Sequence, residues 1–255
     1  MKLKIITTVS DNTNANLQKL SQSLIGWDFK IIHNPNIGWD WGGWDNHYQW
    51  LCSDEAKEYT HVIYTDGFDT LALGDQKEAE EKLAKMLESN PNAFIYSVEK
   101  HWFPWEGTDV APLDCLVYKA KFDEKTKHLT ENHRWRYANG GQYAGSIEAV
   151  KNWYEQAKIA CVQGRTKEGQ RNNQAYANAF YAEDTENRLI LDFNCELFQT
   201  LSHSGVNHGS PEEFGVDERR LINKLTGSKP CFVHNNGIKS QVEAQFMYDI
   251  LQMTQ

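Results

Sequence analysis

The chain has 255 residues, of which 40% are hydrophobic and 24% charged, and this composition predicts a globular protein with a sizeable core. The net charge is −9 at pH 7, and an acidic chain without a lysine- and arginine-rich cluster repels a phosphate backbone, so nucleic acid is not an expected partner. No apolar run reaches the roughly 18 residues of a membrane-spanning helix, so no membrane span is expected.

The first hundred residues alternate between predicted strands and helices. Strands are expected at Leu3–Val9, 28–34, Val62–Thr65 and 93–99. Helices are expected at Leu17–Leu24, 46–57 and 75–89. Buried strands that alternate with amphipathic helices are typical of a mostly parallel sheet covered by helices.

The second half is less regular. An aromatic, proline-containing loop at 101–115 precedes a short strand in "YANGGQYAG" and a helix from Ile147. The remaining expected elements are a helix at 172–183, a strand at 188–194, an apolar turn at 196–201, a strand in "KPCFVHNNG" and a helix at 241–252. No repeat, low-complexity tract or linker divides the chain. We therefore predict one α/β domain over residues 1–255, with a mostly parallel central sheet flanked by helices.

Cysteine usage and the first residues bear on the compartment. The five cysteines are scattered and never form a CxxC pair, which indicates reduced thiols and argues against a disulfide framework or a zinc site. The opening "MKLKIITTVSD" has too short an apolar run for a signal peptide and is interpreted as the first strand. The expected localisation is therefore cytoplasmic or otherwise non-secreted.

The stretch "VIYTDGFDT" ends a predicted strand in two carboxylates, Asp66 and Asp69. Ligands of open parallel sheets bind beyond the carboxyl ends of the strands. Residues three apart on a strand point to opposite faces, so the chain must turn at Gly67 if the carboxylates are to converge. Converging carboxylates suit a Mg²⁺ or Mn²⁺ ion, which would neutralise a diphosphate leaving group. The alternative is an ordinary Asp-Gly turn whose aspartates cap the next helix.

Two later segments carry further candidate ligands. His234 ends a predicted strand and could complete the metal site, because imidazole suits Mn²⁺ better than Mg²⁺; the alternative is a structural histidine. Gly237 and Lys239 follow it and could approach phosphates. Asn139 and the two glycines after it fit either a backbone passing close to a ligand or an ordinary tight turn.

Six motifs occur in an order that resembles one family. They are "TTVS", "VIYTDGFDTLAL", "IYSVEKHWFPW", "YANGGQYAG", "LILDFNCELFQTL" and "VHNNG". Together they resemble the metal-dependent, GT-A-type glycosyltransferase domain of the multifunctional procollagen lysyl hydroxylases. The resemblance spans most of the chain and implies a GT-A-like, Rossmann-like fold. No single motif is decisive, but their shared order makes coincidence improbable.

The resemblance implies an activity and a set of site residues. The reaction would be Mn²⁺-dependent, with Mg²⁺ as the alternative, and would move a hexose from a UDP-sugar to a hydroxyl acceptor. Glucose is favoured over galactose, and galactosyl-hydroxylysine of a collagen-like protein is the implied acceptor. Asp66, Asp69 and His234 would hold the metal. The implied nucleotide-sugar contacts are Thr8, Val9, Trp44, Asp66, Gly67, Phe68, Asn236, Gly237 and Lys239. The implied catalytic or acceptor-side residues are Glu99, Trp102, Asn139, Asn172, Asn173 and Asp192.

The chain also departs from the family pattern. Asn172 and Asn173 stand where the family has two aspartates, and an asparagine can hydrogen-bond a sugar but cannot act as a base. The family's lysine has no match in "GGWDNH", where His47 is the nearest cation. These departures leave the acceptor open.

Two other classes compete with the transferase. A phosphatase or phosphotransferase of the haloacid-dehalogenase type needs its aspartates two apart, whereas Asp66 and Asp69 are three apart. A non-catalytic carbohydrate-binding module could use the nine tryptophans to stack on sugars, but it would need neither UDP nor Mn²⁺. The sequence leaves open whether the chain forms a homodimer.

Overall fold

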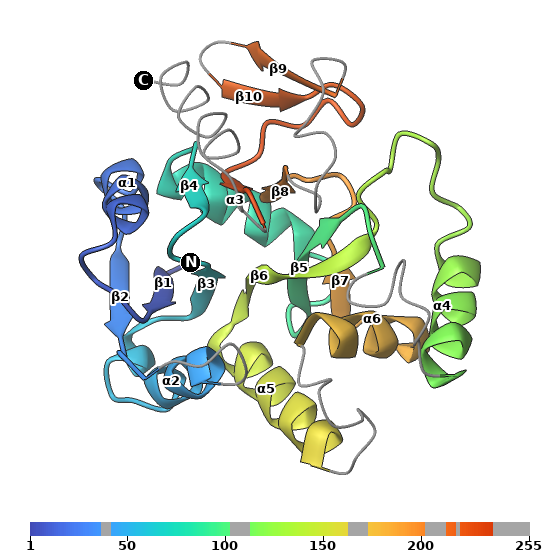
Figure 1. Cartoon of the computed structure of the whole chain (residues 1–255), viewed down its shortest axis with the longest axis horizontal. Coiled ribbons are helices and arrows are strands. Elements are labelled where there is room, and N and C mark those ends of the chain that lie inside the picture. The colour runs from blue at the N-terminus through green and yellow to red at the C-terminus, as the bar shows by residue number, and fades with distance from the viewer. Residues whose placement is uncertain (37–41, 103–112, 163–172, 202–212, 218–219, 237–255) are drawn as a thin grey trace.

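The computed structural model describes residues 1–36, 42–102, 113–162, 173–201, 213–217 and 220–236 (Figure 1). Its main sheet has six strands in the order β2-β1-β3-β6-β5-β7. Their bounds are β1 (Leu3–Val9), β2 (Phe29–His33), β3 (His61–Thr65), β5 (Phe94–Glu99), β6 (Tyr137–Ser146) and β7 (Leu189–Leu191). In this sheet β6 pairs antiparallel with both β3 and β5, whereas the other pairs are parallel. The expected mostly parallel α/β fold is confirmed.

Helices cover both faces of this sheet. They are α1 (Ala15–Ser23), α2 (Gly42–Leu51), α3 (Gln76–Met86), α4 (Leu113–Lys125), α5 (Ile147–Val162) and α6 (Asn173–Glu183). Because side chains alternate along a strand, Ile63 of β3 packs in one core with α1 and α3, whereas Val62 and Tyr64 pack in another with α2 and α5. No helix in the described part of the chain is long and apolar enough to cross a membrane.

A second, three-stranded sheet lies beside the first. Its order is β4-β11-β8, with β4 (Thr70–Ala72), β8 (Phe198–Thr200) and β11 (Phe232–His234). The strand β11 pairs antiparallel with β4 and parallel with β8, which sets His234 opposite Thr70. This sheet therefore brings the end of the described chain back to the segment that follows β3.

The sequence missed several of these elements. Residues 196–201 were expected to form a turn, but 198–200 form β8; α4, β4 and the hairpin of β9 (Phe214–Asp217) and β10 (Arg220–Asn223) were not expected. The helix expected over 46–57 begins at Gly42, ends at Leu51 and is followed by the 3₁₀ turn Ala56–Glu58. Short strands are stabilised by the strands with which they pair, and the local sequence pattern does not show which strands will pair. The helix expected at 241–252 lies outside the described residues.

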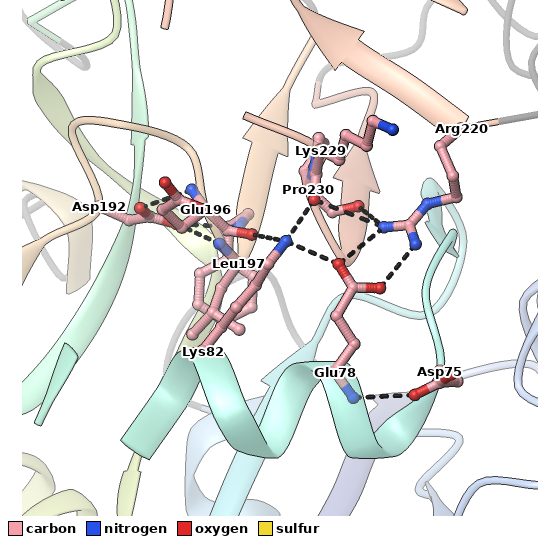
Figure 2. Close-up of polar contacts among 10 residues, drawn as sticks. Asp75, Glu78, Lys82, Asp192, Glu196, Leu197, Arg220, Lys229 and Pro230 are labelled. Carbon is pink, nitrogen blue, oxygen red and sulfur yellow. Dashed lines mark hydrogen bonds and ion pairs between the residues drawn. The ribbon is translucent and has the colours of Figure 1, made fainter. Parts of the chain in front are cut away.

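Polar contacts from α3 hold the second sheet in place (Figure 2). The helix starts after Asp75, whose carboxylate accepts the Glu78 N–H at 2.8 Å. Glu78 pairs with Lys82 at 2.8 Å and with Arg220 at 2.6 Å. These two cations also donate to main-chain oxygens of the loops that lead into β8 and β11, namely those of Glu196, Lys229 and Pro230. The side chains of α3 therefore tie down both loops.

His47 lies in a buried aromatic stack on the other face. Its ring stacks on Tyr64 and Tyr143 with centroids 5.3 and 5.5 Å away, and its Nδ1 lies 2.5 Å from the Tyr143 hydroxyl. Complete burial lowers the pKa of His47 to about 3. The expectation that His47 serves as the nearest cation is therefore wrong, because the buried ring is neutral.

This burial predicts a pH dependence of stability. Unfolded His47 takes up a proton below its ordinary pKa of about 6.5, whereas the native ring stays neutral down to about 3. Native stability is therefore lost as the pH falls through that window, by about 2 kcal/mol between pH 7 and pH 5. Urea unfolding should show this extra loss in the wild type but not in His47→Phe. The lost Tyr143 contact adds only a constant offset, so parallel pH profiles would contradict the prediction.

Candidate functional site

Three side chains from two distant parts of the chain converge where β3 ends. Asp66 follows β3 directly, Asp69 precedes β4, and His234 is the last residue of β11. One ligand atom from each lies within 4.8 Å of the others. The His234 Nε2 is 3.2 Å from an Asp69 carboxylate oxygen and 3.6 Å from an Asp66 oxygen. The predicted convergence of these three residues is thus present.

The electrostatics of this cluster suit a cation. Desolvation by the surrounding protein and the neighbouring Asp69 raise the pKa of Asp66 to about 7, although part of its side chain stays exposed. Burial opposes a charge on His234, but the carboxylates of Asp69 and Asp66 outweigh it and raise the pKa of the imidazole. The His234 side chain is 3% exposed, whereas those of Asp66 and Asp69 are 41% and 23% exposed. Two reachable carboxylates and one imidazole nitrogen that face a common point are a donor set for a divalent ion.

Gly141 forms the floor of the cluster. Opposite the adjacent residues Tyr96 and Ser97 of β5, β6 places Tyr143 and Asn139, so residues 140–142 bulge out of the pairing. The Gly141 carbonyl accepts the Asp66 N–H at 2.8 Å. A β-carbon on Gly141 would lie 2.2 Å from His234 Cε1 and 2.7 Å from an Asp66 oxygen. A side chain at residue 141 would therefore occupy the space of two candidate ligands.

Glu99 and Asn139 lie directly behind the cluster. Glu99 is 6% exposed, and its carboxylate accepts the side-chain amides of Asn139 at 3.4 Å, Asn236 at 2.7 Å and Gln174. Burial raises the pKa of Glu99 to about 7 although these donors oppose the shift. Asn139 in turn contacts the His234 ring at 3.0 Å. The carboxylate of Glu99 therefore points into the interior, towards Asn139, which in turn contacts His234.

Comparison with known proteins identifies the family. The family model described as the PLOD GT domain matches residues 46–248, which is most of the chain. The chain belongs to the PLOD GT domain family. This agrees with the resemblance that the six sequence motifs carry.

Two individual proteins are similar to this PLOD GT domain. A solved "glycosyltransferase involved in the glycosylation of the major capsid of PBCV-1" matches 99% of this chain and 100% of its own, with a TM-score of 0.50 and 13% identity. That match supports a glycosyltransferase fold. "Uncharacterized protein R699" of Acanthamoeba polyphaga mimivirus is 22% identical over 231 residues, which are 89% of this chain. The chain spans 43% of the length of that viral relative.

Some of the residues expected near the nucleotide lie beside the metal cluster. Thr8 and Val9 end β1, and a β-carbon on Gly67 would lie only 2.3 Å from Val9 Cγ1. Gly67 is thus needed for its close approach to β1. Phe68 is partly buried against the core that contains α1 and α3. Asn236 directs its amide towards Glu99. The side chain of Trp44, together with Gly237 and Lys239, lies outside the described residues.

The residues expected around the sugar divide into two groups. Asn173 begins α6 and donates to the Gly140 carbonyl at 3.3 Å, so it borders the bulge of β6. Asp192 is 2% exposed, and its carboxylate accepts three main-chain N–H groups, those of Glu196, Leu197 and Phe198. These contacts favour a role in shaping the loop before β8 over the expected place facing a sugar. Asn172 lies outside the described residues.

The Trp102 side chain is buried in the core. Its side chain is 2% exposed and packs edge-on against Phe122 and Tyr137, with ring centroids 5.4 and 5.3 Å away. A ring enclosed in this way has no free face for an acceptor. The acceptor-side place of Trp102 stays a prediction, and the enclosed ring could contact an acceptor only after moving.

Three residues of the site have roles that the sequence did not predict. Tyr64 donates its hydroxyl to Asp66 at 3.1 Å, and its spacing of two from Asp66 could have indicated a shared face. Gly141 was noted only as part of a glycine pair. Gln174 bridges the Gly140 N–H and Glu99, and nothing in the local sequence of α6 points to that contact.

The floor position yields a direct prediction. Gly141→Ala should lower the affinity for Mn²⁺ alone by about 10- to 100-fold, because the new methyl group displaces His234 and Asp66. Titration calorimetry measures the affinity, and circular dichroism checks the fold. The matched control is Gly145→Ala on the same strand, where a β-carbon meets its nearest neighbour at 3.3 Å. Equal Mn²⁺ affinities of the two variants would contradict the assigned floor.

Proposed function

We propose that this PLOD GT domain transfers a hexose from a UDP-sugar to a hydroxyl acceptor, with Mn²⁺ held by Asp66, Asp69 and His234. The observation that carries the proposal is the convergence of these three ligands at the carboxyl end of β3, in a chain of glycosyltransferase family and fold. The nitrogen ligand favours Mn²⁺ over Mg²⁺, which stays the alternative metal.

The proposed role of the metal is to neutralise the negative charge of the leaving group. A divalent ion at this site would offset the charge of a departing nucleoside diphosphate. Asp66 and Asp69 lie on the turn next to the end of β1, so Thr8 and Val9 are the proposed neighbours of the uridine. Gly237 and Lys239 follow His234 in sequence and are the proposed phosphate contacts.

Positioning would supply most of the remaining catalysis. Transfer with a stabilised leaving group needs the sugar and the acceptor held in a reactive geometry more than it needs a strong base. Asn173 borders the β6 bulge and is the proposed hydrogen-bond partner of a sugar or acceptor hydroxyl, because an asparagine can bind a hydroxyl but cannot act as a base. We keep glucose as the favoured sugar and galactosyl-hydroxylysine of a collagen-like protein as the acceptor, both on the family resemblance.

The test is UDP release from a panel of UDP-sugars with and without Mn²⁺. Wild-type protein should release UDP only with Mn²⁺ and should prefer UDP-glucose or UDP-galactose. Asp69→Ala should reduce the rate by at least about 100-fold, because even residues that only support a metal ligand cost about 10- to 100-fold. Asp54→Ala is the matched control, since the Asp54 side chain is 97% exposed and forms an ion pair with Lys57 at 2.7 Å.

A negative result would be as informative. If no UDP-sugar is bound or hydrolysed by wild-type protein, the transferase proposal fails and a carbohydrate-binding module takes its place. If Asp69→Ala retains wild-type turnover, the donor assignment survives but the metal centre fails.

A further inference from the structure

The two nitrogens of the His234 ring face different surroundings. Nε2 faces the carboxylates of Asp66 and Asp69 at 3.6 and 3.2 Å. Nδ1 faces the interior, where it lies 3.0 Å from the side-chain oxygen of Asn139. His234 is 2% exposed and Asn139 is 4% exposed, so little water competes for this contact.

The orientation of the Asn139 amide follows from its other neighbours. The same oxygen accepts the Gly141 N–H at 3.1 Å, and the Asn139 nitrogen lies 3.4 Å from a Glu99 carboxylate oxygen. A flipped amide would set N–H against N–H at Gly141 and oxygen against carboxylate at Glu99. The atom that meets His234 is therefore the amide oxygen, which can only accept a hydrogen bond.

From this geometry we propose that Asn139 is a positioning residue that keeps a proton on Nδ1 of His234 and thereby leaves Nε2 as the metal-binding atom. The proposal rests on the proposed metal centre. Metal-bound histidines commonly donate their second ring N–H to a fixed acceptor, which sets the tautomer and the ring orientation. Here a buried amide, rather than a carboxylate, is that acceptor.

Asn139 is itself held by a directed chain of contacts. The Gln174 side-chain oxygen accepts the Gly140 N–H at 3.1 Å, so the Gln174 amide nitrogen must face Glu99. Glu99 also accepts the Asn236 amide at 2.7 Å and then the Asn139 amide. In every hydrogen bond of this chain of contacts, a donor group therefore meets an acceptor group. The start of α6 and the turn after β11 thus both support the ring of His234 through Glu99 and Asn139.

The test combines metal binding with a direct view of the ring. Asn139→Leu removes the acceptor at similar volume and should lower the affinity for Mn²⁺ alone by about 10- to 100-fold. Nitrogen-15 NMR of the metal-free protein, recorded at a pH at which the His234 ring is neutral, should show a Nδ1 proton on His234 that is protected from exchange in the wild type and lost or fast-exchanging in the variant. His234→Gln assigns the signal.

The matched control is Asn178→Leu. Asn178 is also buried, and its side-chain oxygen also accepts a β6 main-chain N–H, that of Ala138 at 2.8 Å. This variant removes a comparable amide contact next to the site, one that is made to Ala138 and not to His234. It should leave both the Nδ1 proton and the Mn²⁺ affinity as in the wild type, which separates positioning from general loss of packing.

A conservative variant guards against misfolding of Asn139→Leu. Asn139→Asp keeps an oxygen towards His234 and towards the Gly141 N–H, so it should retain the protected Nδ1 proton. The proposal is overturned if wild-type His234 carries no Nδ1 proton, or if Asn139→Leu binds Mn²⁺ like the wild type. If wild-type protein shows the protected proton but binds no Mn²⁺, the metal centre fails, whereas the Asn139 contact stands.

Discussion

The site depends on one close approach, that of the β6 main chain at Gly141 to Asp66 and His234. Its carbonyl accepts the Asp66 N–H, and the missing side chain leaves the space that the two ligands occupy. The bulge of β6 makes this approach geometrically available, because residues 140–142 leave the pairing with β5 at that point. The segments that carry Asp66 and His234 lie far apart in the chain, and they can meet here because β6 carries no side chain at residue 141.

Around that contact, hydrogen-bond partners stabilise the charged side chains of the cluster. Two carboxylates that face one point repel each other, and a buried imidazole is costly to charge, so the arrangement is stable only with favourable partners. Tyr64 donates to Asp66 from one core, and Asn139 accepts from His234 on the far side. The contacts of Lys82 on α3 and Arg220 on β10 with the loop before β11 hold the strand that carries His234. Support for the site therefore comes from both sheets.

Much of this arrangement could be read from local pattern. The alternation of apolar strands and amphipathic helices predicted the α/β fold, and the position of Asp66 after a buried strand predicted a ligand site at a sheet edge. Prediction from residue type was less successful. Trp102 was expected on the acceptor side and His47 was expected to be a cation, but both side chains are enclosed, and enclosure depends on neighbours that are remote in sequence.

The sequence by itself determined the fold class, the family and the three candidate metal ligands, because periodicity, motif order and residue chemistry are local properties. Only the tertiary structure decided which atoms those ligands present and what stands behind them. The pairing of β11 with β4 set His234 beside Asp69, and the contact with Asn139 assigned the two ring nitrogens. Such contacts join residues far apart in the chain, and their geometry exists only once the strands have paired.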